Sequence, residues 1–134
     1  MLLNTETILE HYIIAALWSS TDESTPAGGE PMDANYTADD IAPETRTAME
    51  SDVRDFVDYI SPILGNHDDD LEEYGRRHGI NEMIGHDFWL TRNRRGAGFW
   101  DRGLGELGDE LTDAAKTFGS CDLYIGDDGK VHAS

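Results

Sequence analysis

Residues 86–102 read HDFWLTRNRRGAGFWDR, and the fold predicted for this chain depends on the structure assigned to them. The two ends, HDFWLTRN at 86–93 and GFWDR at 98–102, are rich in aromatic residues, which are common in β-strands. Between them, RRGAG at 94–98 supplies the glycines that a short connecting loop needs. The sequence therefore predicts a β-hairpin over residues 86–102.

A second hairpin is predicted in CDLYIGDDGKVHA at 121–133, where Asp128-Gly129 is a strong two-residue turn signal. Between the two hairpins, leucines and alanines recur at helical spacing, which predicts a helix from about Leu104 to Phe118. These segments together predict a small antiparallel sheet of three or four strands with an intervening helix.

The amino-terminal half is predicted to be helical. Apolar residues recur at helical spacing over Thr5–Trp18 and Pro43–Ile60, and a weaker helix covers Asp68 to about His78. Asn4 or Thr5 can cap the first helix. Ser61-Pro62 is expected to end the second, because the residue before a proline is disfavoured in helical conformation.

This order of elements predicts an α+β fold in a single domain over residues 1–134, with amino-terminal helices followed by the sheet. Residues 19–37 separate the first two helices and are rich in Ser, Thr, Gly and Pro. We expect this segment to be a flexible loop.

The balance of charge is the main guide to function. The chain has 28 acidic residues against 10 basic ones, for a net charge of −18. Repulsion of this size opposes a compact fold, so the charge is expected to serve a purpose. The leading hypothesis is a surface that a basic protein binds in place of nucleic acid. The rival is adaptation to a salty cell interior, favoured by the excess of 17 Asp over 11 Glu and by the presence of only two Lys.

The predicted partner-binding carboxylates lie on two helices. Residues three or four apart on a helix are about 5–6 Å apart, so rows of acids can approximate the edge of a duplex. The partner is then a basic, nucleic-acid-binding host protein, and no direct contact with nucleic acid is expected. The proposed residues are Glu50, Asp52, Asp55, Asp58, Asp68, Asp69, Asp70, Glu72 and Glu73.

An alternative site is the cluster of arginine and aromatic side chains around the first predicted hairpin. Such clusters can stack single-stranded nucleic acid, as in a nucleic-acid-binding or virion accessory module. The same arginines can instead pair with carboxylates of their own chain or of a second copy in a homodimer. The residues are Trp89, Arg92, Arg94, Arg95, Trp100 and Arg102.

A second alternative is a small enzyme in which His86, Asp87 and the lone Cys121 act as base, orienting group and nucleophile. No recognised catalytic fingerprint supports it, so the chain is expected not to be an enzyme. No metal or cofactor is expected either. A calcium loop starting at Asp68 would need Gly and Glu where the chain has Glu73 and Gly79.

The segments HDFWLTRN and RRGAGFWDRGLGELGDELTDAAKTFG, continuing into DLYIGDDGK, resemble a group of small acidic bacteriophage proteins that share the signature GHDFWLTRN-x-x-GAGFWDR. The resemblance covers residues 85–130 and implies a phage or prophage gene, without implying an activity. By analogy of size and charge, such a protein is expected to inhibit a host defence enzyme of the restriction or CRISPR type by mimicking DNA.

The expected location is the cytoplasm of an infected or lysogenic cell. A single cysteine, Cys121, excludes an internal disulfide and fits a reducing compartment. The N-terminal stretch lacks the basic residues of a secretory signal, and no segment approaches the ~20 apolar residues of a membrane span.

Overall fold

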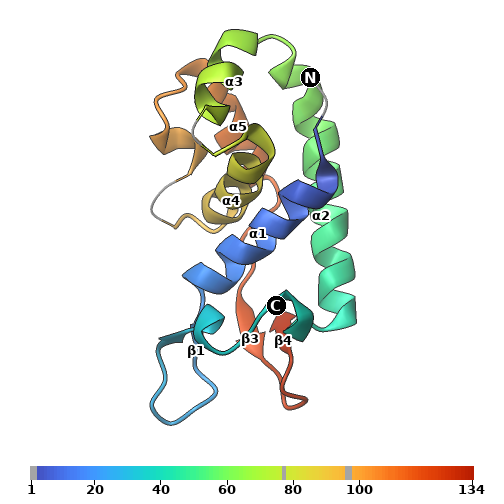
Figure 1. Cartoon of the computed structure of the whole chain (residues 1–134), viewed down its shortest axis with the longest axis vertical. Coiled ribbons are helices and arrows are strands. Elements are labelled where there is room, and N and C mark those ends of the chain that lie inside the picture. The colour runs from blue at the N-terminus through green and yellow to red at the C-terminus, as the bar shows by residue number, and fades with distance from the viewer. Residues whose placement is uncertain (1–2, 77, 96–97) are drawn as a thin grey trace.

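The fold consists of amino-terminal helices and two short antiparallel β-hairpins, which confirms the predicted α+β class (Figure 1). A computed structural model describes residues 3–76, 78–95 and 98–134. Within these ranges the α-helices are α1 Thr5–Ser19, α2 Pro43–Leu64, α3 Asp68–Gly75, α4 Ile80–Arg92 and α5 Glu106–Lys116. The strands are β1 Thr21–Asp22, β2 Glu30–Pro31, β3 Leu123–Ile125 and β4 Val131–Ala133, and the 3-10 turns are η1 Met32–Ala34, η2 Ala38–Asp40 and η3 Phe99–Asp101.

The packing of α1 against α4 is the most extensive contact between elements of the fold. Gly85 makes it possible, because a Cβ at this position would overlap the backbone carbonyl of Ile8. At the start of α1, Asn4 caps the helix by accepting a hydrogen bond from the Thr7 amide, as predicted. The Asn4 amide also donates to Asn81 Oδ1 at 2.9 Å, which fixes this end of α1 to α4.

The predicted strand over residues 86–93 is wrong, because these residues belong to α4. Ile84, Phe88 and Thr91 are buried at helical spacing, and their packing against other helices outweighs the strand preference of the aromatic residues. Residues 98–102 form no strand either, since Phe99–Asp101 is the turn η3. The glycine loop predicted at 94–98 is described only in part, because residues 96–97 lie outside the described ranges.

The second predicted helix does not end at Ser61-Pro62, and α2 continues to Leu64. Pro62 cannot donate to the carbonyl four residues earlier, a loss that is tolerable on the exposed side of the helix. Ser61 Oγ donates to the Val57 carbonyl at 2.6 Å, and Leu64 extends the buried stripe of the helix by one turn beyond Ile60. The gain from burying Leu64 accounts for the longer helix.

The C-terminal hairpin is confirmed, with Tyr124 opposite His132 in the antiparallel ladder. Its connection is longer than the predicted two residues: the Gly129 amide donates to the Gly126 carbonyl, and Gly129 has a φ of 77°. A turn followed by a left-handed glycine is a common hairpin connection. The hairpin is joined to the residues before α2, because the Ala42 amide donates to the Val131 carbonyl at 2.9 Å.

Residues 19–37, predicted to be a flexible loop, contain the ladder of β1 and β2 and the turn η1. Met32 in η1 is fully buried and packs into the core. The segment therefore contributes one anchored side chain to the fold.

The core is built around aromatic rings from four parts of the chain. Phe56 of α2 stacks on Phe88 of α4 with ring centroids 3.9 Å apart. Phe99 lies 5.8 Å from Phe56, and Phe118 meets Phe88 edge-on at 5.1 Å. These rings join α2, α4, η3 and the residues after α5 in one cluster. Among the described residues, no helix has the length and apolar character needed to cross a membrane.

We expect Gly85→Ala to destabilise the protein, since the added methyl group must push α1 away from α4. Overpacking of this kind costs about 1–3 kcal/mol of unfolding free energy, occasionally more. Urea unfolding followed by circular dichroism measures the loss. Gly65→Ala is the matched control, because Gly65 has a φ of −60° and a Cβ there would lie 3.6 Å from the nearest carbonyl. Equal stabilities for the two variants would contradict this account of the contact between α1 and α4.

Candidate functional site

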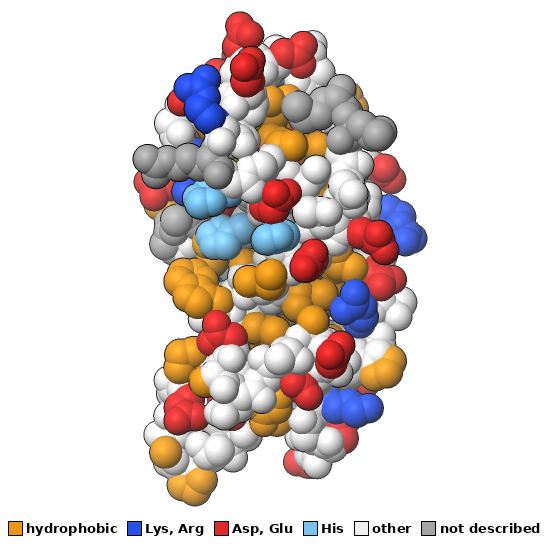
Figure 2. Space-filling model, in the orientation of Figure 1, with side chains coloured by type: hydrophobic (Ala, Val, Ile, Leu, Met, Phe, Trp, Pro, Cys, Tyr) orange, Lys and Arg blue, Asp and Glu red, His pale blue; other side chains and the backbone are white. Residues whose placement is uncertain are grey.

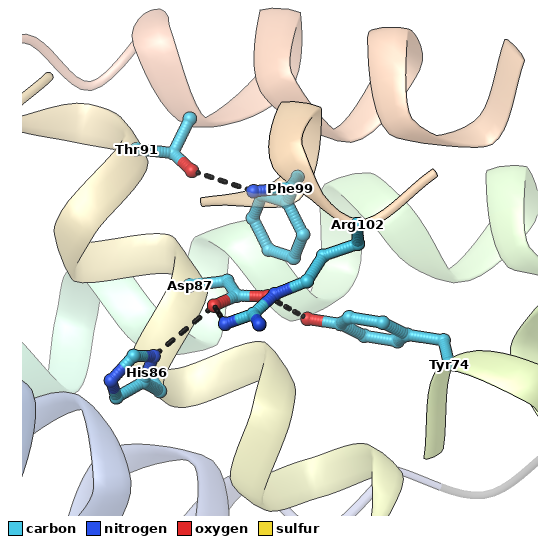
Figure 3. A network of polar contacts seen from close by, with 6 residues as sticks. All are labelled: Tyr74, His86, Asp87, Thr91, Phe99 and Arg102. Atoms are coloured by element: carbon cyan, nitrogen blue, oxygen red, sulfur yellow. Dashed lines mark hydrogen bonds and ion pairs between the residues drawn. The ribbon is translucent and has the colours of Figure 1, made fainter. Parts of the chain in front are cut away.

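Asp87 on α4 has no exposed surface and is the centre of a polar network (Figure 3). Arg102 donates to it through two nitrogens, Nη2 to Oδ1 at 2.7 Å and Nε to Oδ2 at 3.0 Å. The Tyr74 hydroxyl from α3 donates at 2.6 Å, and the neighbouring His86 lies with Nδ1 3.1 Å from Oδ1. The carboxylate therefore holds together α3, α4 and the residues after η3.

Burial and hydrogen bonding act on Asp87 in opposite directions. Burial raises the pKa of its carboxyl, but the hydrogen bonds from His86, Arg102 and Tyr74 together outweigh it, so the pKa lies below its ordinary value. Tyr74 shows the converse effect. Burial and the neighbouring Asp87 charge raise the pKa of its hydroxyl well above the ordinary value. The network is therefore a carboxylate that accepts hydrogen bonds from neutral Tyr74 and cationic Arg102.

The connection after α4 returns Arg102 to Asp87. The Thr91 hydroxyl accepts a hydrogen bond from the Phe99 amide at 3.1 Å, which fixes the start of η3 beside the end of α4. Gly98 lies so close to Thr91 that a Cβ at Gly98 would overlap the hydroxyl. Figure 3 shows Phe99 and Arg102 on this returning segment, facing Thr91 and Asp87 of α4.

A second ion pair, between the buried Arg92 and the partly exposed Asp52, lies further along α4. Arg92 donates to Asp52 of α2 at 2.8 Å and to the Tyr12 hydroxyl of α1 at 3.0 Å. Its other nitrogens donate to the carbonyls of Phe118 and Gly119, and its guanidinium lies 5.7 Å from the Phe88 ring centroid. Burial is the largest influence on Tyr12 and raises the pKa of its hydroxyl far above the ordinary value. Arg92 is therefore a structural residue.

The predicted platform of arginine and aromatic side chains is not assembled as an exposed surface. Trp89 is fully buried, and its indole nitrogen donates to Ser19 Oγ at 2.8 Å. Arg95 donates to the Ser19 carbonyl, while Arg94 and Trp100 are exposed. Arg92, Arg95 and Arg102 each pair with a carboxylate of the chain, as one of the alternatives expects.

The acidic residues of α2 do not form a single row. Glu50 and Asp52 lie about 160° apart around the helix at 100° per residue. Glu50 pairs with Arg46 at 3.5 Å and Asp52 with Arg92, whereas Asp55 and Asp58 are exposed. The freely accessible carboxylates of α2 are therefore fewer than the sequence pattern predicts.

The acidic residues of α3 are all exposed, and the fold adds carboxylates that the sequence analysis missed. His67, just before α3, lies 3.5 Å from Asp70 and 3.1 Å from Glu110 of α5, so it joins the two helices. The exposed side of α5 carries Glu106, Asp109 and Asp113. The spacing of three and four residues between these acids is the sequence pattern from which an acidic face of α5 could have been predicted. We call the exposed carboxylates of α2, α3 and α5 the acidic surface; they are Asp55, Asp58, Asp68, Asp69, Asp70, Glu72, Glu73, Glu106, Asp109 and Asp113.

Cys121 does not join His86 and Asp87. Its amide donates to Asn93 Oδ1 at 2.7 Å, which places it beyond the other end of α4, seven residues or about 10 Å along the helix from His86. Burial raises the pKa of its thiol, and so reduces the reactive thiolate. Cys121, the nucleophile of the enzyme hypothesis, therefore does not lie beside His86 and Asp87.

The described residues contain no group of three or more His, Cys, Asp or Glu side chains arranged to hold a metal ion. No family model, curated protein or solved structure matches this chain. The resemblance to acidic phage proteins therefore stays a prediction, while its shared residues acquire structural roles. Gly85, Asp87, Arg92 and Arg102 of the signature all serve the packing of α4 described above.

We expect Asp87→Asn to destabilise the protein by about 1–3 kcal/mol at neutral pH, because the hydrogen bonds from Tyr74 and Arg102 lose their charged acceptor while Arg102 keeps part of its contact with solvent. The pKa of Asp87 is lowered in the folded state, so its contribution is present above the ordinary value of 3.8 and is lost as pH falls through the folded-state pKa. The difference between wild type and variant should therefore shrink below about pH 4. Urea unfolding at pH 7, 5 and 3 measures it, with the exposed Asp58→Asn as control. A difference that stays constant down to pH 3 would contradict this role.

Proposed function

We propose that this chain binds a basic, nucleic-acid-binding protein through the acidic surface of α2, α3 and α5, in place of nucleic acid. On the sequence resemblance given above, we propose that a phage or prophage gene encodes this chain. By analogy of size and charge, we propose that the partner is a host defence enzyme. The proposal concerns binding, since Cys121 lies apart from His86 and Asp87.

The main support for this proposal is that many of the arginines pair with carboxylates of the chain itself. Arg92 and Arg102 are used inside the fold, and Arg46, Arg76 and Arg95 pair with neighbouring carboxylates. Five of the nine Lys and Arg residues that the structure describes are therefore engaged by the chain's own acids. Glu73 is paired with Arg76, and Asp70 and Glu110 lie close to His67. The exposed carboxylates without an ion pair among the described residues are left to interact with the Lys and Arg side chains of a basic partner; they are Asp55, Asp58, Asp68, Asp69, Glu72, Glu106, Asp109 and Asp113.

The distribution of charge also bears on how a partner would be recognised. Figure 2 shows acidic side chains spread over one face of the molecule, with basic ones between them on part of it. Charge arranged in this way accelerates encounter over long range more than it adds affinity. The proposed complex is therefore expected to form quickly and to depend on ionic strength.

We expect the triple variant Asp55→Asn, Asp58→Asn, Asp69→Asn to bind the partner with an association rate about tenfold slower than wild type at 0.15 M salt. These side chains are exposed, so the fold should be unaffected. Proteins captured from a bacterial lysate on the immobilised wild-type chain provide the partner, and surface plasmon resonance gives the rates. Duplex DNA added in solution should compete for the same partner.

The matched control is Asp33→Asn, Asp39→Asn, Asp127→Asn, which removes the same charge from exposed positions outside the acidic surface. It should retain most of the wild-type rate. If both triple variants associate equally fast, or if duplex DNA does not compete, the acidic surface is not the binding site. If loss of Arg94 and Trp100 abolishes binding instead, the arginine and aromatic residues form the interface.

The salt dependence of stability separates this proposal from salt adaptation. We expect the melting temperature to rise modestly with KCl and to level off by a few hundred millimolar, because the screening length is already about 8 Å at 0.15 M. Differential scanning calorimetry between 0.02 and 2 M KCl measures the curve. A chain that folds only in molar salt would show that the carboxylates serve solvation in a salty cell, and the proposed function would lose its basis.

A further inference from the structure

A cavity of about 390 Å³ lies beside the Asp87 network, outside the acidic surface. Its volume falls in the range of small-molecule sites, about 300–1,000 Å³. Figure 2 shows histidine side chains gathered on this face of the molecule. The lining residues are His11, His78, Glu82, Met83, His86 and Arg102.

Two of the lining side chains are held in place by the buried carboxylate. Because Asp87 is ionised, it accepts a hydrogen bond from Nδ1–H of His86, which leaves Nε2 of the ring for a ligand. Arg102 uses Nε and Nη2 on Asp87, and its Nη1 has no hydrogen-bond partner among the described residues. The network therefore orients one imidazole and one guanidinium at the cavity and keeps polar atoms of both available.

Two further imidazoles reach the same cavity from other elements. His11 comes from α1 and His78 from the connection between α3 and α4. Within the described ranges neither ring has a hydrogen-bond partner. The remaining histidines of the chain behave differently: His67 pairs with Asp70 and Glu110, and His132 lies 3.0 Å from Asp128. The histidines without partners are thus those that line the cavity.

Arg102 is the fixed cation that a ligand meets in the cavity. Asp87 has no exposed surface, so a ligand meets the Arg102 guanidinium rather than the carboxylate beneath it. Among the described lining residues, Glu82 is the one carboxylate. An adjoining hollow of about 320 Å³ shares His78, Met83 and Arg102 and adds Asp70, Glu73 and Arg76.

The carboxylates of the adjoining hollow are already engaged by other side chains. Glu73 pairs with Arg76 at 3.1 Å, and Asp70 lies 3.5 Å from His67. A metal ion is a poorer match, because the described side chains form no group of three metal ligands. The planar guanidinium of Arg102 suits the oxygens of a phosphate or a carboxylate, and an imidazole donates to them through a nitrogen that carries a proton.

We propose that the cavity between α1 and α4 binds a small molecule bearing a phosphate or carboxylate group, which contacts Arg102 and the imidazoles of His11, His78 and His86. The lining of this cavity includes none of the carboxylates of the acidic surface, although Asp70 and Glu73 of that surface line the adjoining hollow. The ligand brings negative charge to the side of the molecule where histidines and Arg102 converge.

NMR of the histidine ring signals tests the site directly. The wild-type chain is titrated with inorganic phosphate, and separately with acetate, at pH 6.5 and at an ionic strength held constant with NaCl. We expect saturable shifts of the His11, His78 and His86 signals with at least one of the two anions, and no saturation at His67 and His132. Saturation by phosphate alone identifies a phosphate site, and saturation by acetate alone identifies a carboxylate site.

Variants test which side chains bind. His78→Gln and His11→Gln should each weaken the apparent affinity severalfold or more, with unchanged circular dichroism, while the control His132→Gln leaves it as in wild type. Arg102→Lys keeps the charge and should weaken it further, though this variant also perturbs Asp87. No saturable shift with either anion, equal shifts at all five histidines, or saturable binding of Zn²⁺ in place of both anions would overturn the proposal.

Discussion

A carboxylate buried among helices needs hydrogen-bond donors around it. In this protein the elements that surround Asp87 supply them. An unpaired charge in such a place costs several kcal/mol, so the donors cannot be omitted without loss of the fold. They come from separate parts of the chain: Tyr74 from α3, His86 from α4 itself and Arg102 from the segment after η3. The relative positions of these elements follow from one side chain, and so does the orientation of His86 and Arg102 at the neighbouring cavity.

Arg92 complements Asp87 on the same helix. It bonds to Tyr12 of α1, Asp52 of α2 and the carbonyls that follow α5, so α4 carries one buried anion and one buried cation, each matched by other elements. Several polar side chains within residues 85–102 therefore have structural partners, some inside this segment, as for Asp87 with Arg102, and some outside it, as for Arg92. His86 and Trp100 stay accessible to a ligand or partner.

The helices that the sequence predicts correctly are those with a clear apolar stripe, as in α2, or a recognisable cap, as at Asn4. The prediction fails at residues 86–93, where the aromatic composition suggests a strand although Phe88 and Thr91 are buried at helical spacing. It also fails to place Asp52 and Asp55 correctly. Both are aspartates of the same helix, yet Asp52 pairs with Arg92, 40 residues away in the chain, whereas Asp55 is exposed. Residues that pair across many positions of the chain leave no local pattern in the sequence. For the same reason, the sequence does not reveal that His11, His78 and His86 line one cavity.

The sequence separation of these contacts has a consequence for synthesis. The bonds of Asp87 close loops of only 13 and 15 residues, so α3, α4 and η3 can organise soon after they emerge. The most extensive contact of α1, with α4, is not local, because Tyr12 meets Arg92 across 80 residues and Ser19 meets Trp89 across 70. At a synthesis rate of 5–20 residues per second, about 4–16 s pass between the synthesis of Tyr12 in α1 and that of Arg92 in α4, the helix that covers the apolar face of α1. During that interval the apolar face of α1 that packs on α4 is open to chaperones, and α1 completes its docking only after α4 has been made.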